Sequence, residues 1–209
     1  MTIDFYTNPM SRGRIIHWML EELGQPYETH WIAYGAHKAP DYLAVNPMGK
    51  FPTLVHDGKV VTECAAICMY LADVFPAAGL APTPEEKADY YRWILFAAGP
   101  VEQAVTAKSM GWIAPKEKEG TLGFGNYENT IAALDAMLRD REYVCGKRFT
   151  AADVYVGSHV GWGIQFGTIA KTPAFEAYFD RLKERDAYKR QVTLNDAKMA
   201  EMRPPAAAT

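Results

Sequence analysis

The chain has 209 residues, 49% of them hydrophobic and 22% charged, and its formal net charge is −3 at pH 7. These values are those of an ordinary globular protein, which is long enough to bury a core without a metal or a disulfide. Because the charge is nearly balanced and no long basic run occurs, we expect neither a nucleic acid nor an anionic membrane as a partner. No apolar stretch is long enough to span a bilayer.

Cysteine and histidine usage narrows the class further. Cys64, Cys68 and Cys145 give an odd count, which is typical of a reducing compartment rather than of a secreted scaffold. The first residues lack the basic region and apolar core of a signal peptide, so we expect a cytoplasmic protein. The five histidines show no metal-ligand spacing and no CxxC pair occurs, so we expect no metal.

The first third of the chain predicts a βαβ unit followed by ββα. Strand patterns alternate with helical ones, Gly24 follows the first helical pattern as a C-cap residue does, and Asp57-Gly58 is typical of a hairpin turn. The expected strands cover residues 2–6, 27–33, 51–56 and 59–62, and the expected helices cover residues 12–23 and 64–74.

Beyond residue 75 the patterns are helical. Thr150 and Asp153 have the spacing of a capping box at a helix start, and Gly99-Pro100 predicts a kink. Helices are expected over residues 85–111 and 126–141, from Thr150 onward, and around residues 175–182. The expected organisation is a first domain over 1–75, a linker rich in proline and alanine over 76–84, a helical domain over 85–203 and a loose tail over 204–209.

The dipeptide Phe51-Pro52 interrupts an otherwise good strand, because proline cannot donate a ladder hydrogen bond. One interpretation is a cis peptide bond that turns the chain and leaves the N–H and C=O of Phe51 free to pair with an extended peptide ligand. The other is an edge-strand proline with no ligand. The pattern alone leaves both open.

Two expected helix starts hold further candidates, because the first N–H groups of a helix lack intrahelical partners and attract carboxylates. Glu63 beside Cys64 suits the ammonium and carboxylate of a free amino acid, or Glu63 is a plain acidic residue at a helix N-terminus. The Ser11 hydroxyl is either a helix cap or a donor to a thiolate, whose pKa such a site lowers.

Four segments, taken in order and spacing, resemble one family over nearly the whole chain. They are Leu20-Glu21-Glu22-Leu23-Gly24, residues 42–54, Glu63-Cys64-Ala65-Ala66-Ile67 and Phe149-Thr150-Ala151-Ala152-Asp153. With them the chain resembles the cytosolic glutathione S-transferase family, of a bacterial type. The resemblance implies an α/β thioredoxin-like N-terminal domain (βαβ-ββα), an all-α C-terminal helical-bundle domain and a homodimer.

The resemblance also implies where glutathione binds as a co-substrate. Phe51 pairs with the cysteinyl part through its backbone, and Glu63 matches the acidic residue at the γ-glutamyl end. Cys64 stands where the family usually has serine, so a hydroxyl is lost while the backbone N–H stays available. The glutathione-binding residues implied are Ser11, His37, Lys38, Lys50, Phe51, Pro52, Glu63 and Cys64.

Thiol activation in the family uses tyrosine, serine or cysteine near the first helix. No cysteine precedes Cys64, so the cysteine type is disfavoured. Ser11 lies in the matching loop, although a gapless match places Met10 at the hydroxyl position, and Tyr6 ends the first strand at a different spacing. We expect Ser11 as the catalytic residue, with Tyr6 second. We expect Arg12 or Arg14 to add electrostatic support for thiol activation.

The implied activity is attack of the glutathione thiolate on an electrophilic carbon of a small apolar co-substrate. The pocket for this second substrate is expected at Met10, Tyr34, Ala97, Pro100 and Trp112. Two alternatives stay open on the same fold. One is a glutathione-dependent disulfide reductase or peroxidase, and the other is a non-catalytic glutathione-binding or interaction protein.

Overall fold

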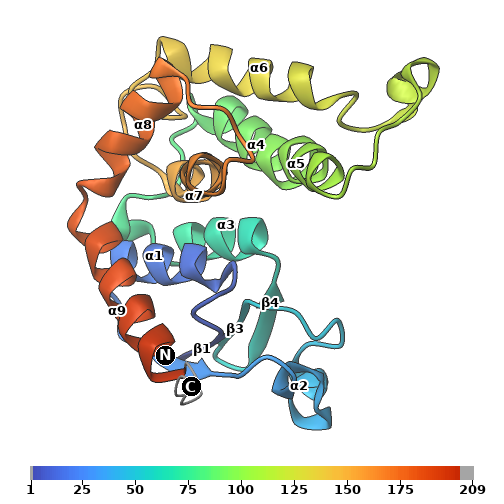
Figure 1. Ribbon diagram of the computed structural model, residues 1–209. Coiled ribbons are helices and arrows are strands. Elements are labelled where there is room, and N and C mark those ends of the chain that lie inside the picture. The colour runs from blue at the N-terminus through green and yellow to red at the C-terminus, as the bar shows by residue number, and fades with distance from the viewer. Residues whose placement is uncertain (1, 203–209) are drawn as a thin grey trace, which may run out of the picture. The chain divides into compact units, whose positions relative to one another are not determined.

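The computed structural model describes residues 2–202, and Figure 1 shows its strands and helices. Contacts between residues divide this part of the chain into two compact units, one of residues 2–71 and 185–202 and the other of residues 72–184. The first unit holds the sheet and the second is helical. The element order confirms the expected βαβ-ββα unit followed by a mostly helical region.

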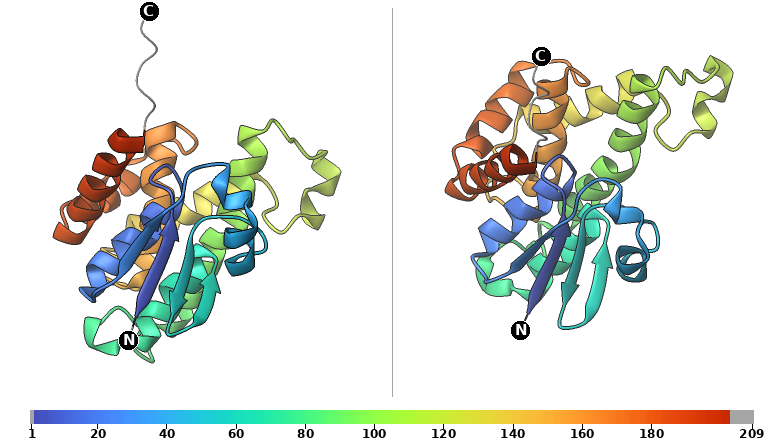
Figure 2. Two further views of the ribbon diagram at one scale, coloured as in Figure 1. Left: turned by 90° about the horizontal axis from the view of Figure 1, so that it is seen from below. Right: turned by 60° about the horizontal axis from the view of Figure 1, so that its bottom comes forward.

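The strands of the first unit form one mixed sheet in the order β2-β1-β3-β4, which Figure 2 shows with β1 in the interior. β1 pairs in parallel with β2 and antiparallel with β3, and β3 pairs antiparallel with β4. The hairpin turn has positive φ at Asp57 (46°) and Gly58 (77°), as the aspartate–glycine pair predicts. The strand bounds are β1 Ile3–Thr7, β2 Glu28–Trp31, β3 Thr53–His56 and β4 Lys59–Thr62.

Successive residues of β1 face opposite sides of the sheet, which separates a packed core from a polar face. Phe5 is fully buried, and its ring lies 4.8 Å from that of His17 on α1. Tyr6 points the other way, and its ring lies 6.2 Å from that of Tyr42 on α2. The helices of this unit are α1 (Gly13–Leu23), η1 (Ala36–Lys38), α2 (Pro40–Val45) and α3 (Cys64–Val74), of which residues up to 71 belong here.

α9 (Asp186–Met202) also belongs to the sheet unit, where it packs along α1 (Figure 1). The Trp18 ring meets that of Tyr188 edge-on at 5.0 Å, and Arg185 binds both carboxylate oxygens of Glu22 at 2.6 and 2.7 Å. Sequence patterns gave no sign of this pairing. The expected boundaries at 1–75, 76–84 and 85–203 stay a prediction, and the expected tail, 204–209, lies outside the described residues.

The helical unit follows the expected order, with the kink at Gly99-Pro100 realised as a π-helical turn. Proline has no N–H to donate inside a helix, so the backbone adjusts where Pro100 interrupts the ladder. Its elements are η2 (Pro76–Ala78), α4 (Lys87–Phe96), η3 (Ala97–Val101), α5 (Glu102–Ser109), η4 (Lys116–Thr121), α6 (Tyr127–Arg139), α7 (Ala151–Phe166) and α8 (Pro173–Lys183).

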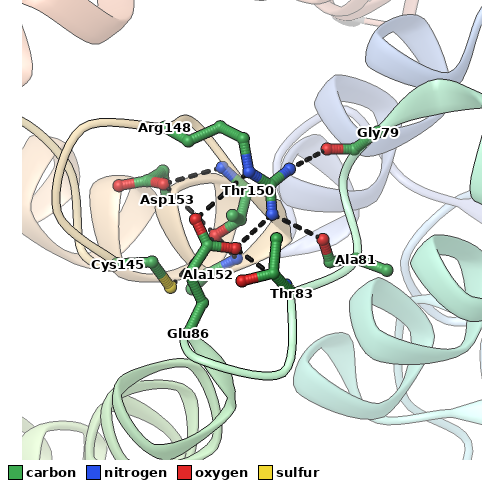
Figure 3. Close-up of polar contacts among 9 residues, drawn as sticks. All are labelled: Gly79, Ala81, Thr83, Glu86, Cys145, Arg148, Thr150, Ala152 and Asp153. Atoms are coloured by element: carbon green, nitrogen blue, oxygen red, sulfur yellow. Dashed lines mark hydrogen bonds and ion pairs between the residues drawn. The ribbon is translucent and has the colours of Figure 1, made fainter.

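The start of α7 is held by a capping box and lies beside an arginine ion pair (Figure 3). Thr150 and Asp153 form the expected capping box, with the Thr150 N–H donating to Asp153 at 2.9 Å. Beside it, Arg148 forms an ion pair with Glu86 and donates to the carbonyls of Gly79 and Ala81. One guanidinium thereby fixes the segment before α4 to the loop before α7.

Within residues 2–202, the helices are too short or too polar to cross a membrane.

His17 joins α1 to α9 through a buried hydrogen bond. Its Nδ1 lies 3.2 Å from Oδ1 of Asn195, while Nδ2 of Asn195 donates to the carbonyl of Gln191 at 2.8 Å. The amide oxygen therefore faces the ring, so Nδ1 carries the proton and Nε2 accepts from the Thr29 hydroxyl at 3.3 Å. Burial lowers the pKa of His17 to about 4.

This lowered pKa predicts acid sensitivity. The unfolded chain, with a His17 pKa near 6.5, binds the proton first, so stability present above pH 6.5 is lost as the pH falls toward 4. We expect a loss of about 2 kcal/mol between pH 7.5 and 5, measured by urea unfolding. The His17→Gln variant should show a flatter pH dependence over that range, and equal slopes in both proteins would contradict the assignment.

Candidate functional site

The loop between β1 and α1 is organised by Asn8, whose side chain is fully buried. Its Nδ2 donates to the carbonyl of Ile32 at 2.8 Å, and its Oδ1 accepts from the N–H of Met10 at 2.9 Å. One amide thus ties the end of β1 to the chain after β2 and closes an Asx turn over Pro9. Sequence reasoning treated Asn8-Pro9 only as a strand breaker.

Ser11 lies two residues before α1, whose N-cap residue is Arg12. Its hydroxyl donates to the carbonyl of Asn8 at 2.7 Å and accepts from the N–H of Gly13 at 3.0 Å. A hydroxyl has one proton, so in this arrangement that proton is used within the loop. Gly13 is needed here because a Cβ at this position would lie 1.8 Å from Oγ1 of Thr7.

Tyr6 lies away from this loop. Its ring stacks on His30 at 4.5 Å, on the sheet face that carries α2. Burial raises the pKa of Tyr6, and the charges of Asp4 and Glu28 raise it further. The phenol is therefore held in its neutral form, on the opposite face from the rings that pack against α1.

A second buried asparagine builds the loop that leads to Phe51. Nδ2 of Asn46 donates to the carbonyl of Lys50 and to Oγ1 of Thr53, both at 3.0 Å, and its Oδ1 accepts from the N–H of Met48 at 3.1 Å. The Tyr42 hydroxyl lies 2.6 Å from the Lys50 carbonyl and 2.9 Å from Oγ1 of Thr53. Three buried side chains, Tyr42, Asn46 and Thr53, and the Lys50 carbonyl thus satisfy one another around this turn.

The turn over residues 46–50 packs closely on the segment that carries His37 and Lys38. Nζ of Lys38 donates to the carbonyl of Met48 at 3.0 Å. Gly49 has φ 54°, and a Cβ there would lie 2.8 Å from the carbonyl oxygen of His37. Only glycine allows this approach.

Phe51 lies at the centre of a ring cluster, and its bond to Pro52 is cis, as one of the two sequence interpretations requires. The ring of Phe51 lies 5.3 Å from that of His37 and 6.1 Å from that of Tyr34. Among the described residues, the structure gives neither the N–H nor the C=O of Phe51 a hydrogen-bond partner. These groups are the ones that an extended peptide would use.

Glu63 and Cys64 stand where β4 passes into α3. Glu63 has φ 66°, a left-handed conformation that costs a non-glycine residue about 1–2 kcal/mol. Its side chain is exposed, so packing does not explain the choice of residue. Cys64 is 8% exposed, and its Sγ contacts the carbonyl of Arg12 at 3.6 Å. An unusual backbone at an exposed acidic residue is a feature of functional sites.

Contacts within the sheet unit join most of these segments. The Tyr34 hydroxyl donates to the carbonyl of Met10 at 3.2 Å, which links the ring cluster to the Ser11 loop, and the Cys64–Arg12 contact links that loop to the start of α3. These contacts connect, through their own or neighbouring residues, the expected residues Ser11, His37, Lys38, Phe51, Pro52 and Cys64. Tyr6 joins the ring cluster through Tyr42, whose ring lies 6.2 Å from that of Tyr6 and 5.4 Å from that of Phe51.

The residues expected for the second substrate differ in exposure. Met10 and Tyr34, on the sheet unit, are 56% and 55% exposed. On the helical unit, Trp112 is 68% exposed, Pro100 is half-buried and Ala97 has no exposed surface. The pocket itself stays a prediction.

One group of metal-ligand side chains occurs among the described residues, and sequence spacing did not indicate it. The parallel register places Glu28 beside Asp4, and His30 follows on the same face. The ligand atoms of the three side chains all lie within 4.8 Å of one another. Nε2 of His30 lies 2.8 Å from Oδ1 of Asp4, so two of the three ligand atoms already contact each other.

Comparisons with known proteins agree with the geometry. A family model described as "Glutathione S-transferase, N-terminal domain" matches residues 10–74. The "Glutathione S-transferase GST-4.5" of Xanthomonas campestris pv. campestris is 30% identical over 187 residues, which cover 85% of this chain and 91% of that protein.

Solved structures are similar along most of the chain. A glutathione transferase from Methylococcus capsulatus matches with a TM-score of 0.77 and 25% identity, covering 93% of this chain and 99% of the other. A sphingomonad glutathione S-transferase complexed with glutathione matches with a TM-score of 0.75 and 28% identity, covering 92% and 98%.

The Asn46 network predicts a large and local stability effect. Replacing Asn46 with leucine removes the amide and leaves the Lys50 carbonyl and the Thr53 hydroxyl short of a buried partner, so we expect a loss of about 2–4 kcal/mol in urea unfolding. The control is Met48→Leu on the same turn, which is 68% exposed and should change stability by less than about 0.5 kcal/mol. Equal effects of the two changes would refute the network's role.

Proposed function

Because this chain belongs to the bacterial-type cytosolic glutathione S-transferase family, we propose that it binds glutathione on the sheet unit and lowers the pKa of the bound thiol. The thiolate then attacks an electrophilic carbon of an apolar co-substrate. The single observation that carries the proposal is that the N–H and C=O of Phe51 have no hydrogen-bond partner among the described residues. The ring cluster around Phe51 is linked through Tyr34 to the loop before α1.

The cysteinyl residue of glutathione is proposed to pair with the N–H and C=O of Phe51, as an added strand pairs with a sheet edge. Its neighbours are held in place beforehand by the Asn46 network and by the ring contacts of Phe51. A preformed edge of this kind costs little ordering free energy when the peptide binds.

The γ-glutamyl end is proposed to lie at the start of α3. The first amides of that helix favour a carboxylate, and the exposed carboxylate of Glu63 suits the ammonium group. This assignment explains the left-handed backbone of Glu63, because that backbone conformation sets the direction of the side chain at the helix start.

The glycyl carboxylate is proposed to lie near His37, Lys38 and Lys50. Lys38 is anchored through one hydrogen bond to the Met48 carbonyl, and an ammonium group has two further protons to donate. Lys50 is exposed on the next turn and adds positive charge at the same end of the site.

The thiol is proposed to lie near the start of α1, with Ser11 as its hydrogen-bond donor. Rotation about the Cα–Cβ bond of Ser11 redirects the proton from the Asn8 carbonyl to sulfur. The thiol loses its proton to solvent, the sulfur forms a bond with the electrophilic carbon, and the leaving group departs with the electron pair of the broken bond. Helix-start amides stabilise the thiolate beforehand.

Further parts of the proposal concern the surroundings of the site. Met10 and Tyr34, both exposed on the sheet unit, are proposed to contact the second substrate. We also propose a homodimer and a cytoplasmic location, which the free thiols of Cys64, Cys68 and Cys145 suit.

The choice of Ser11 predicts a shift in the pKa of bound glutathione. Ser11→Ala should raise that pKa by roughly one to two units, because it removes a hydrogen bond to a charged acceptor. Tyr6→Phe removes a hydroxyl on the sheet face that carries α2, away from the Ser11 loop, and should leave the pKa unchanged. Thiolate absorbance against pH measures both. If Ser11→Ala lowers only stability, the hydroxyl acts as a helix cap and the assignment is wrong.

Glu63 predicts opposite changes in stability and binding. Glu63→Gly relieves the left-handed backbone and should leave the free energy of unfolding unchanged or raise it by up to about 1 kcal/mol. The same change should weaken glutathione binding about tenfold in calorimetry, because a charge-assisted hydrogen bond is lost. Glu63→Gln keeps the shape of the side chain and removes its charge, so it should weaken glutathione binding and leave the free energy of unfolding unchanged. Unchanged affinity in both variants would exclude this role.

Turnover decides between transfer and the alternatives. With glutathione present, the protein should consume an aryl halide, with chloride release equal to thioether formed. Turnover of a hydroperoxide without any of the aryl halide would favour the reductase or peroxidase alternative, and glutathione binding without either turnover would favour the non-catalytic one.

A further inference from the structure

Arg14 connects the Ser11 loop with the last helix of the chain. Its Nε donates to the carbonyl of Pro9 at 2.6 Å, and its Nη2 donates to Oδ1 of Asp196 on α9 at 2.7 Å. Nη2 also lies 4.0 Å from the sulfur of Met199. The guanidinium therefore binds the loop through Nε and α9 through Nη2.

The planar guanidinium is what makes a double contact of this kind possible. Its N–H groups point in fixed directions, so a carboxylate that orients Nη2 also orients Nε toward the loop. A lysine ammonium is a point charge on a flexible stem, so even when it donates to two acceptors it does not hold them in a fixed relative orientation. Arg14 is 21% exposed and Asp196 is 51% exposed, so the contact lies at the edge of the unit and is only partly desolvated.

The loop is thereby held from both sides. Asn8 fixes it from the sheet, through Ile32 and Met10, and Arg14 fixes it from α9 through Pro9. In the sequence, Ser11 lies between the two anchoring residues, Asn8 and Arg14. It directly follows Met10, whose N–H donates to Asn8. The position of its hydroxyl depends on both.

We infer that Arg14 is a positioning residue, which uses Asp196 of α9 to set the loop that holds the glutathione thiol. The inference rests on the proposed function and changes one part of the sequence expectation. The structure gives Arg14 three protein partners, Pro9, Asp196 and Met199, so its role is mechanical rather than direct electrostatic support of the glutathione sulfur.

The α1–α9 seam supplies a matched control. Nε of Arg190 pairs with Oε2 of Glu21 at 2.7 Å, and Nη2 of Arg190 donates to the Glu21 carbonyl at 3.1 Å. This pair joins the same two helices with the same chemistry, but it lies more than one helical turn from the loop and makes no contact with it. Arg190→Gln therefore removes an equivalent ion pair without the proposed coupling.

The test compares Asp196→Ala, Arg14→Lys and Arg190→Gln. We expect Asp196→Ala and Arg14→Lys to speed amide hydrogen exchange at Met10 and Ser11 by about tenfold, because the loop loses one of its two anchors. Both changes should weaken glutathione binding about tenfold and raise the pKa of the bound thiol. The double variant should resemble each single one, since both act through one contact. Arg190→Gln should leave all three readouts unchanged.

The two hypotheses fail in different ways. If wild-type protein binds no glutathione, the proposed function fails, while the hydrogen-exchange comparison still tests the coupling. If Asp196→Ala and Arg190→Gln give the same exchange rates at Met10 and Ser11, the coupling is overturned even when glutathione binds. Loss of glutathione affinity in all three variants would show a general effect of the contact between α1 and α9, and it would also overturn the proposed coupling.

Discussion

The site depends on two buried asparagine side chains that satisfy the backbone of two loops. Asn8 and Asn46 each begin an Asn-Pro-Met sequence, and each accepts the methionine N–H while donating to a carbonyl farther along the chain. A buried amide with all its hydrogen bonds made holds a loop rigidly, whereas one with a missing partner costs more than the bond is worth. The backbone around Ser11 and Phe51 follows from these two turns, and the functional side chains stand on it.

The sequence predicted the elements of the sheet unit well because their signals are local. Alternation, the Asp57-Gly58 turn and Gly24 each act within a few residues, and β4 and α3 have the predicted bounds. The capping box at Thr150 and Asp153 was found for the same reason. By contrast, the union of α1 with α9 rests on pairs such as Glu22 with Arg185, which lie far apart in the chain and have no local pattern.

The roles of the candidate site residues stay predictions. Motif spacing indicated Phe51, Glu63 and the Ser11 loop, and the structure adds how they are supported. The sequence could not show that the Ser11 hydroxyl donates to the Asn8 carbonyl, because that bond depends on the rotation of one side chain. Nor could it show that Tyr6 lies on the sheet face opposite α1, because that depends on the exact register of β1. The group of Asp4, Glu28 and His30 was missed because strand register, and not sequence distance, brings it together.

The placement of α9 has a consequence for biosynthesis. Residues 72–184 form a unit of their own and leave the ribosome before residues 185–202, which complete the unit begun by residues 2–71. The helical unit is thus able to fold while the earlier one still exposes the flank of α1, including the apolar ring of Trp18. Until α9 is synthesised, the nascent chain therefore keeps a hydrophobic surface on α1 exposed. Chaperones that bind such surfaces have the longest time to act on this N-terminal unit, whose synthesis begins first.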